Sequence, residues 1–427
     1  MRKTILAAAL VASLALLAVV VWWQPGGETP AGPTTGLDVV VIGVDSMDWF
    51  VLRGLLVDGA LPTTTSLLRR GVTGEIAADR PPLPEVAWTA LGRGRALAEG
   101  ELSRVARTDG RLYGLTPELA RIVEREGGRT LTVGWPASWP ADDAEGLVVA
   151  PYRPVSATHE TGLPAAILAG DTGACPEALR ERVDAIVSRN EAMLDAEFDR
   201  LIFDGGGDGM WAEHLDAARW AFLSDLIAID AAASLMADES PDLTMVCLGG
   251  LDAVSHRFLA PAMPSFFPDS PEEYARYEDL LDNYYRFVDT CVERMRRLTD
   301  EDSVIVICST YGLHPTADVP GVTGSHVNGP PGVLILRGAG VAQRPQALEL
   351  SSADFAPTLL ALLGVPIPTD MDGRVVPEAL PAGLLQRFPP VYEGTLDIPE
   401  VTPDAALVSA ADALVGERLS RLRSAGQ

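Results

Sequence analysis

Residues Leu37–Val44 read LDVVVIGV, and Asp45 follows them directly. A continuous apolar run of this length is typical of a strand that is buried on both faces of a parallel sheet. The same pattern predicts four further strands, at Thr130–Gly134, Leu243–Leu248, Val304–Cys308 and Val333–Leu336.

Segments with helical patterns lie between these runs. The helices are expected from about Trp49, and at Thr63–Arg70, Pro117–Glu126, Ala217–Met236, Glu272–Arg297 and Ala353–Leu363. Strands that alternate with helices form a parallel sheet whose faces are both covered. The fold class predicted is therefore α/β, with a mostly parallel central sheet and helices on both faces.

The composition of the 427 residues restricts the function. Hydrophobic residues make up 47% and charged residues 22%, which excludes a disordered, collagen-like or multi-span membrane chain. The net charge of −26 repels a phosphate backbone, so no nucleic-acid polymer is expected as a partner. A small phosphorylated substrate remains compatible with this charge, because bound metal ions can invert the local potential.

The first 23 residues predict export. Met1-Arg2-Lys3 precede an uncharged run from Thr4 to Trp23 that ends in two tryptophans suited to a membrane interface. No Ala-x-Ala cleavage site follows, so a retained membrane anchor is favoured over a cleaved secretory signal. In both cases the rest of the chain is expected on the periplasmic or extracellular side.

Composition also divides the remaining chain. A Pro/Gly-rich linker is predicted at 24–36, the α/β domain at 37–387, and a C-terminal extension at 388–427. Residues 152–211 are less regular and are interpreted as an inserted cap. Cys175, Cys247, Cys291 and Cys308 form no C-x-x-C motif, and buried free thiols are expected at least for Cys247 and Cys308.

Polar residues that follow the predicted strands are the candidates for chemistry, because ligands bind at the carboxyl ends of parallel strands. Asp252 and His256 are four residues apart, so one helical turn can direct both side chains to one point. With His326 they make an Asp plus two His set that suits zinc. A D-x-x-x-H pair taken alone is more often a local hydrogen-bonded or capping arrangement.

The whole constellation resembles the type I phosphodiesterase/nucleotide pyrophosphatase branch of the alkaline phosphatase superfamily. The resemblance covers about Leu37 to Gly373 and implies an alkaline phosphatase-like fold. The matching segments, in order, are VVVIGVDSMDW (Val39–Trp49), ALPTTTSLLRRGVTGE (Ala60–Glu75), PPLPEVAWTALGRG (Pro81–Gly94), DLTMVCLGGLDAVSHRF (Asp242–Phe258), EDSVIVICSTYG (Glu301–Gly312), GSHVNGPPGVLIL (Gly324–Leu336) and DFAPTLLALLGVPIPTDMDG (Asp354–Gly373).

The resemblance implies a role for each matching residue. Asp252, His256 and His326 correspond to the ligands of one zinc-like ion, and Asp45 to a ligand of a second. Thr89 corresponds to the nucleophile and is expected at a helix start, where free N–H groups face the phosphoryl oxygens. An ordinary helix N-cap is the alternative for Thr89.

The second metal site is degenerate at Thr310 and Tyr311. The family has Ser-Asp-His-Gly where this chain has Ser309-Thr310-Tyr311-Gly312, so a carboxylate and an imidazole ligand are missing. His314 and Glu85 are nearby groups that could compensate, with ordinary surface positions as the alternative. Asp48 is interpreted as a helix cap, and Trp135 and Trp139 as core residues rather than pocket walls.

Two functions remain open from the sequence. The first is an exported, metal-dependent phosphohydrolase of the phosphodiesterase/nucleotide pyrophosphatase type, with Thr89 as nucleophile, one firmly held zinc and a doubtful second ion. The alternative is an inactive pseudoenzyme that serves as a binding or assembly module. A sulfatase is disfavoured because no C/S-x-P-x-R motif surrounds Thr89, and a dinucleotide enzyme because no G-x-G-x-x-G follows the first strand.

Overall fold

The computed structural model describes residues 32–77, 84–97, 117–136, 138, 146–151, 173–267, 272–319, 321–341 and 347–396. The predicted membrane segment 1–23, most of the linker and residues 397–427 of the predicted C-terminal extension lie outside these ranges. The predictions for those segments therefore stay predictions.

A nine-stranded sheet forms the centre of the domain, in the order β11-β2-β10-β7-β1-β6-β3-β4-β5. The neighbours β7, β1, β6, β3 and β4 run parallel, whereas β10 is antiparallel to β2 and β7, and β5 is antiparallel to β4. The mostly parallel sheet predicted from the sequence is confirmed. The strands are β1 (Val39–Val44), β2 (Val72–Ala77), β3 (Thr130–Val133), β4 (Leu147–Val149), β5 (Ala174–Cys175), β6 (Leu243–Leu248), β7 (Val304–Cys308), β10 (Gly332–Gly338) and β11 (Leu348–Ser351).

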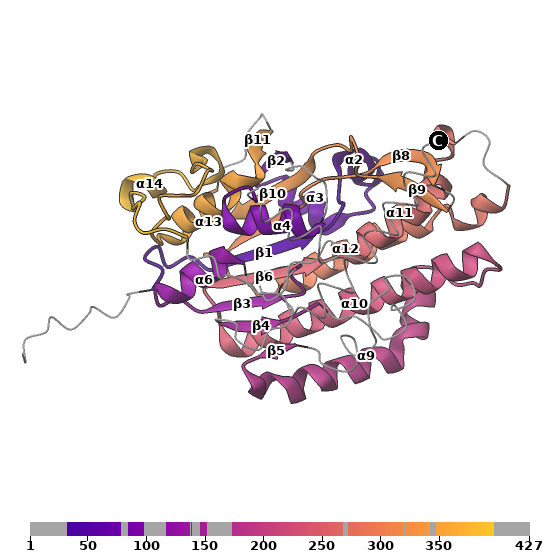
Figure 1. Ribbon diagram of the computed structural model, residues 1–427, viewed down its shortest axis with the longest axis horizontal. Coiled ribbons are helices and arrows are strands. Elements are labelled where there is room, and N and C mark those ends of the chain that lie inside the picture. The colour runs from indigo at the N-terminus through magenta and orange to yellow at the C-terminus, as the bar shows by residue number, and fades with distance from the viewer. Residues whose placement is uncertain are drawn as a thin grey trace, which may run out of the picture.

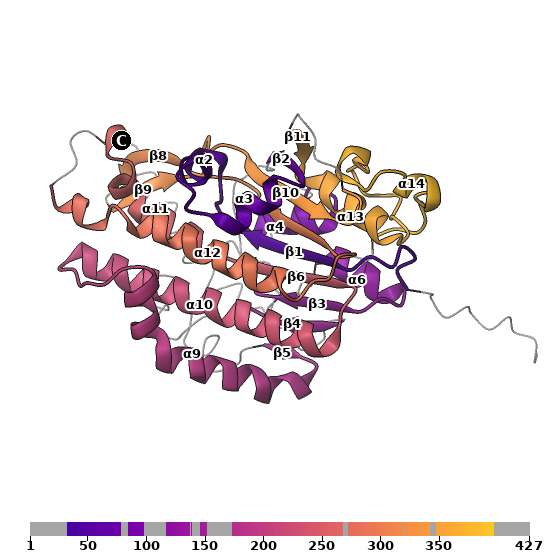
Figure 2. The same ribbon diagram turned by 180° about the vertical axis from the view of Figure 1, so that it is seen from behind.

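Helices cover both faces of this sheet, as Figures 1 and 2 show from opposite sides. On one face lie α9 (Arg180–Leu201), α10 (Met210–Glu239) and α12 (Leu280–Arg296), and on the other α4 (Pro84–Arg93), α6 (Glu118–Arg125) and α13 (Phe355–Leu363). The remaining helices are α2 (Trp49–Val57), α3 (Pro62–Leu68), α11 (Gly250–Ala262), α14 (Leu384–Arg387) and short 3₁₀ turns at Glu177–Leu179, Pro264–Phe266, Glu272–Tyr277, Ser352–Asp354 and Pro377–Ala379.

The position of β1 at the centre of the sheet explains why apolar and polar residues do not alternate along its sequence. Val40 and Ile42 belong to the core beneath α10 and α12, whereas Val39 and Val41 belong to the core beneath α4 and α13. Both faces of β1 are buried, so every position from Val39 to Val44 must tolerate an apolar environment.

The segment 152–211 is more regular than predicted. Its described part forms β5, a 3₁₀ turn and the 22-residue helix α9, and α10 already begins at Met210. Arg182 of α9 donates hydrogen bonds to Ser234 of α10, so α9 packs against the main helical layer. The prediction of irregular structure is wrong for these residues, and the part at 152–172 lies outside the description.

Among the described residues, α10 is the one helix long and apolar enough to cross a membrane. However, 72% of its apolar window is buried inside the domain, as expected for a core helix.

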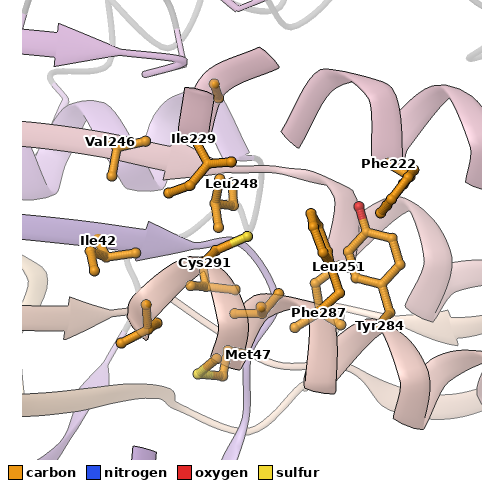
Figure 3. Close-up of a cluster of buried hydrophobic side chains, with 14 of the residues drawn as sticks. Ile42, Met47, Phe222, Ile229, Val246, Leu248, Leu251, Tyr284, Phe287 and Cys291 are labelled. Atoms are coloured by element: carbon orange, nitrogen blue, oxygen red, sulfur yellow. The ribbon is translucent and has the colours of Figure 1, made fainter. Parts of the chain in front are cut away.

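A dense apolar core supports the loops that leave β1 and β6 (Figure 3). Ile42 and Leu248 come from the two strands, and Leu251 from the first turn of α11. Tyr284, Phe287 and Cys291 of α12 pack beneath them, with Phe222 and Ile229 of α10 alongside. Close packing leaves these loops little freedom to shift, which fixes the side chains they carry.

Candidate active site

Polar residues meet at the carboxyl ends of three adjacent strands. Asp45 follows β1, α11 begins after β6, and Ser309 follows β7. The backbone N–H of Asp45 donates to Leu248 O at 2.9 Å, so the ends of β1 and β6 lie level. This is the edge of the sheet at which the strand ends were expected to place a ligand site.

His326 reaches this edge from a separate hairpin of β8 (His314–Val319) and β9 (Val322–Ser325). The hairpin is attached to α11, because Ala260 N donates to Thr323 Oγ1 at 3.1 Å. His326 comes directly after β9, and α11 carries Asp252 and His256.

The side chains of Asp252, His256 and His326 converge, with their nearest polar atoms within 4.8 Å of one another. Asp252 Oδ1 lies 2.9 Å from His326 Nε2 and 3.4 Å from His256 Nε2, and the two Nε2 atoms are 3.1 Å apart. Ligands of a tetrahedral zinc ion, with metal–ligand distances of about 2.0–2.1 Å, are separated by about 3.3 Å. The three atoms thus form a triangle of the size that one divalent cation requires.

The backbone orients both imidazole rings for this role. His256 Nδ1 is 2.8 Å from Gly324 O, and His326 Nδ1 is 3.2 Å from Gly312 O. A carbonyl oxygen accepts only from an N–H, so the proton of each neutral ring is placed on Nδ1 and the lone pair on Nε2. Two lone pairs that face each other at 3.1 Å repel unless a proton or a cation lies between them. The donor set therefore fits a metal ion.

The charges of the triad reinforce one another. Burial alone would raise the pKa of Asp252, but hydrogen bonds and charge from the two histidines outweigh it and hold that pKa well below its usual range. Burial lowers the pKa of His256, yet without a bound cation a second ring proton, on Nε2, donates to Asp252, and this hydrogen bond outweighs burial and raises the pKa. Asp252 is thus anionic at neutral pH.

Ser46 supports the triad and was missed by the sequence reasoning. Its hydroxyl donates a hydrogen bond to Asp252 Oδ1, and the residue is buried. Its φ is 65°, a left-handed conformation that costs a non-glycine residue energy and persists only where the surroundings enforce it. The position of Ser46 two residues after the end of a buried strand was the only signal in the sequence.

A buried carboxylate, Asp225 of α10, holds the start of α11. Gly250 N donates to both of its oxygens at 3.1 Å, and the Tyr284 hydroxyl donates to Oδ2 at 2.9 Å. Burial raises the pKa of Asp225 to about 7, against the lowering effect of these hydrogen bonds. A Cβ on Gly250 would lie 1.7 Å from the Tyr284 oxygen, so this packing requires glycine.

Asp45 and Thr89 are positioned from β1 and α4. Trp88 Nε1 donates to Asp45 Oδ1 at 3.0 Å. The close packing of Trp88 on β1 depends on Gly43, where a Cβ would meet the indole ring at 2.8 Å. Thr89 is partly exposed and is the sixth residue of α4. The expectation that Thr89 stands at a helix start is wrong, because the helix begins at Pro84, a residue suited to a first helical position.

The degenerate positions after β7 are buried. Thr310 is fully buried, and within the described residues its hydroxyl has no hydrogen-bond partner. The Tyr311 ring packs against the His326 imidazole, with ring centroids 4.3 Å apart. Tyr311 therefore occupies space beside the triad and restricts the orientation of His326.

The other residues singled out in the sequence lie as follows. Asp48 caps α2, since its side chain accepts from Phe50 N and Val51 N, which confirms that prediction. His314 is exposed on β8, where its Nδ1 is 3.4 Å from Ser325 O. Trp135 is buried in the core against Trp88, as predicted. The side chains of Glu85 and Trp139 lie outside the described part of the chain.

Comparison with known proteins identifies the family. Residues 104–352, more than half of the chain, match the family described as type I phosphodiesterase / nucleotide pyrophosphatase. The chain belongs to this family, and its membership assigns it to the phosphoric ester hydrolases. No curated protein sequence matches it. The match contains Asp252, His256 and His326 but begins after Asp45 and Thr89.

Solved structures with a similar arrangement are distant in sequence. The alkaline phosphatase PafA is 11% identical, with a TM-score of 0.49, over 80% of this chain and 98% of that one. Murine ectonucleotide pyrophosphatase / phosphodiesterase 5 is 11% identical, with a TM-score of 0.44, over 77% and 95%. A sulfatase described as putative, from Bacteroides thetaiotaomicron, is 12% identical, with a TM-score of 0.49, over 80% and 73%. Similarities this low transfer no substrate.

Proposed function

We propose that this protein hydrolyses phosphodiester or pyrophosphate bonds in a small phosphorylated substrate. Thr89 is the proposed nucleophile. The proposed cofactor is a divalent cation, with zinc as the first choice, held by Asp252, His256 and His326. The observation that carries the proposal is the triangle of ligand atoms with both Nδ1 atoms bound to backbone carbonyls. Histidines that bind a metal through Nε2 commonly have Nδ1 held by a backbone carbonyl in this way.

Each residue of the site has a distinct proposed role in hydrolysis. A bound cation would supply positive charge that polarises the phosphoryl group. The Thr89 hydroxyl would attack phosphorus, expel the alcohol or phosphate leaving group, and form a phosphothreonine that water then hydrolyses. Asp45, held by Trp88, would orient or deprotonate the attacking hydroxyl.

Hydrolysis of bis(4-nitrophenyl) phosphate by the metal-loaded protein tests this proposal. Thr89→Ala should lower kcat by orders of magnitude, because the proposed phosphothreonine cannot form without the Thr89 hydroxyl. Thr65→Ala is the matched control, since Thr65 is also a partly exposed threonine in a helix, α3. Equal rates for the wild type and Thr89→Ala would exclude Thr89 as the nucleophile.

A binding module without turnover is the second candidate, and the burial of Thr310 and Tyr311 favours it. Neither residue offers the carboxylate or imidazole that a second metal ion requires. Under this alternative the wild type binds a phosphonate but does not hydrolyse the diester. The double change Thr310→Asp with Tyr311→His would then raise the rate by restoring the missing ligand types.

The proposed location is outside the cytoplasm, with the chain attached to the membrane through residues 1–23. Support comes from the uncharged run Thr4–Trp23 behind Met1-Arg2-Lys3. Fractionation of cells into membrane and soluble fractions, followed by protease treatment of intact spheroplasts, tests the proposal. Protection of the domain from protease would contradict it.

A further inference from the structure

A cavity of about 220 Å³ lies beside the metal triad and has one charged end and one apolar end. Asp45 and Asp252 form part of its wall at the carboxyl ends of β1 and β6. Two carboxylates at one end would repel an anionic phosphoryl group, so that end accepts phosphate only when a cation neutralises it.

Away from the carboxylates the wall is apolar. Val133 and Val149 contribute from the ends of β3 and β4, and Ile227 and Ala228 from α10. The lining contains no lysine, arginine or histidine among the residues that the structure describes. This part of the cavity therefore has no cationic side chain to bind a second phosphate or a carboxylate, and it favours an apolar substituent.

Trp220 of α10 completes this wall. Its indole N–H is buried and forms no hydrogen bond within the described ranges. The indole also offers an aromatic surface against which a ring can pack.

We propose that this cavity binds the organic group of the substrate, and that this group is a single aromatic ring or an apolar group of similar size. The inference rests on the proposed phosphoester hydrolysis. An apolar cavity of about 150 Å³ holds one benzene molecule. A cavity of about 220 Å³ therefore has room for one ring with a small substituent.

Gly249 provides a direct way to block the cavity. It lines the cavity, is exposed, and has a φ of −95° that any residue adopts. A Cβ at Gly249 would meet no atom within 4 Å, so Gly249→Leu should fold and place its side chain at the cavity wall. Gly54 of α2 is the matched control, because it is also exposed, helical and free of neighbours within 4 Å of a Cβ.

The experiment measures binding by titration calorimetry, with zinc-loaded full-length protein and two probes, phenylphosphonate and methylphosphonate. Phenylphosphonate should bind at least about tenfold more tightly, because the buried ring leaves water. Gly249→Leu should reduce this preference to less than about threefold. Gly54→Leu should retain the preference in full.

Each other result contradicts a defined part of the reasoning. Equal affinity for both phosphonates, or a preference that survives Gly249→Leu, would exclude the cavity as the ring site while leaving the proposed hydrolysis intact. Adenosine 5′-monophosphate that binds more tightly than phenylphosphonate would contradict the assignment of a single ring as the organic group. If neither phosphonate binds, the proposed function fails and this inference fails with it.

Discussion

Replacing Asp225 by asparagine should remove a large part of the pH dependence of stability in this protein. Burial raises the pKa of Asp225 from 3.8 to about 7. Each pH unit between these values costs about 1.36 kcal/mol, so ionising the buried carboxylate costs about 4 kcal/mol of folding free energy above pH 7.

The sign follows from the direction of the pKa. A carboxyl whose pKa is raised by folding favours the folded state below pH 3.8, where it is neutral in both states. This advantage falls as the pH rises and is fully lost above about pH 7. Asparagine does not ionise. Its carbonyl can still accept from Gly250 N and its amide can donate to the Tyr284 oxygen, so Asp225→Asn should keep the local packing.

The assay is urea unfolding of metal-free wild type and variant at pH 4.5 and pH 8. At each pH the free energy of unfolding of the wild type is subtracted from that of the variant. This difference should be roughly 3–4 kcal/mol more favourable to the variant at pH 8 than at pH 4.5. Asp195→Asn is the control, because the Asp195 side chain is 86% exposed. For this variant the difference in free energy of unfolding from the wild type should be the same at both pH values. A difference for Asp225→Asn that is independent of pH, or that grows in favour of the wild type, would refute the reasoning.

Three further predictions concern the supports of the metal triad. Ser46→Ala removes the hydrogen bond to Asp252 and should weaken zinc affinity by about 10–100-fold. Competition with a chelator measures this affinity, and an unchanged value would show that Ser46 is dispensable. Gly250→Ala forces a Cβ against the Tyr284 oxygen and should lower the free energy of unfolding by about 1–3 kcal/mol or more, which urea unfolding checks. Tyr284→Phe in the same background removes that oxygen and should recover part of the loss, and no recovery would contradict the proposed clash.

Much of the fold could be predicted because apolar runs mark buried parallel strands directly. β6 and β7 have the bounds that the sequence predicted, and β1 differs by two residues at its start. The short strands β4 and β5 at one end of the sheet were missed, since two or three residues carry no periodicity. The helix α9 was missed although its sequence has apolar residues at helical spacing, because the residues before it show no regular pattern and the two parts were taken as one segment.

The site was predictable where the ligands are close in sequence or match a family motif. Asp252 and His256 share one helical turn, and the convergence of His326 on them followed from the resemblance. Asp225 lies 25 residues before Gly250, and only the folded chain shows that the two meet. The left-handed backbone of Ser46 likewise depends on tertiary packing and has no sequence signature.

The central claim is that Asp252, His256 and His326 together bind one divalent cation. Equilibrium dialysis against zinc, with the bound metal measured by atomic spectroscopy, tests it most directly. We predict about one tightly bound ion per chain. This ion should be lost in His256→Ala and retained in His314→Ala, which alters an exposed histidine on β8. A wild type that binds no zinc, or a His256→Ala variant that binds as tightly as the wild type, would contradict the account.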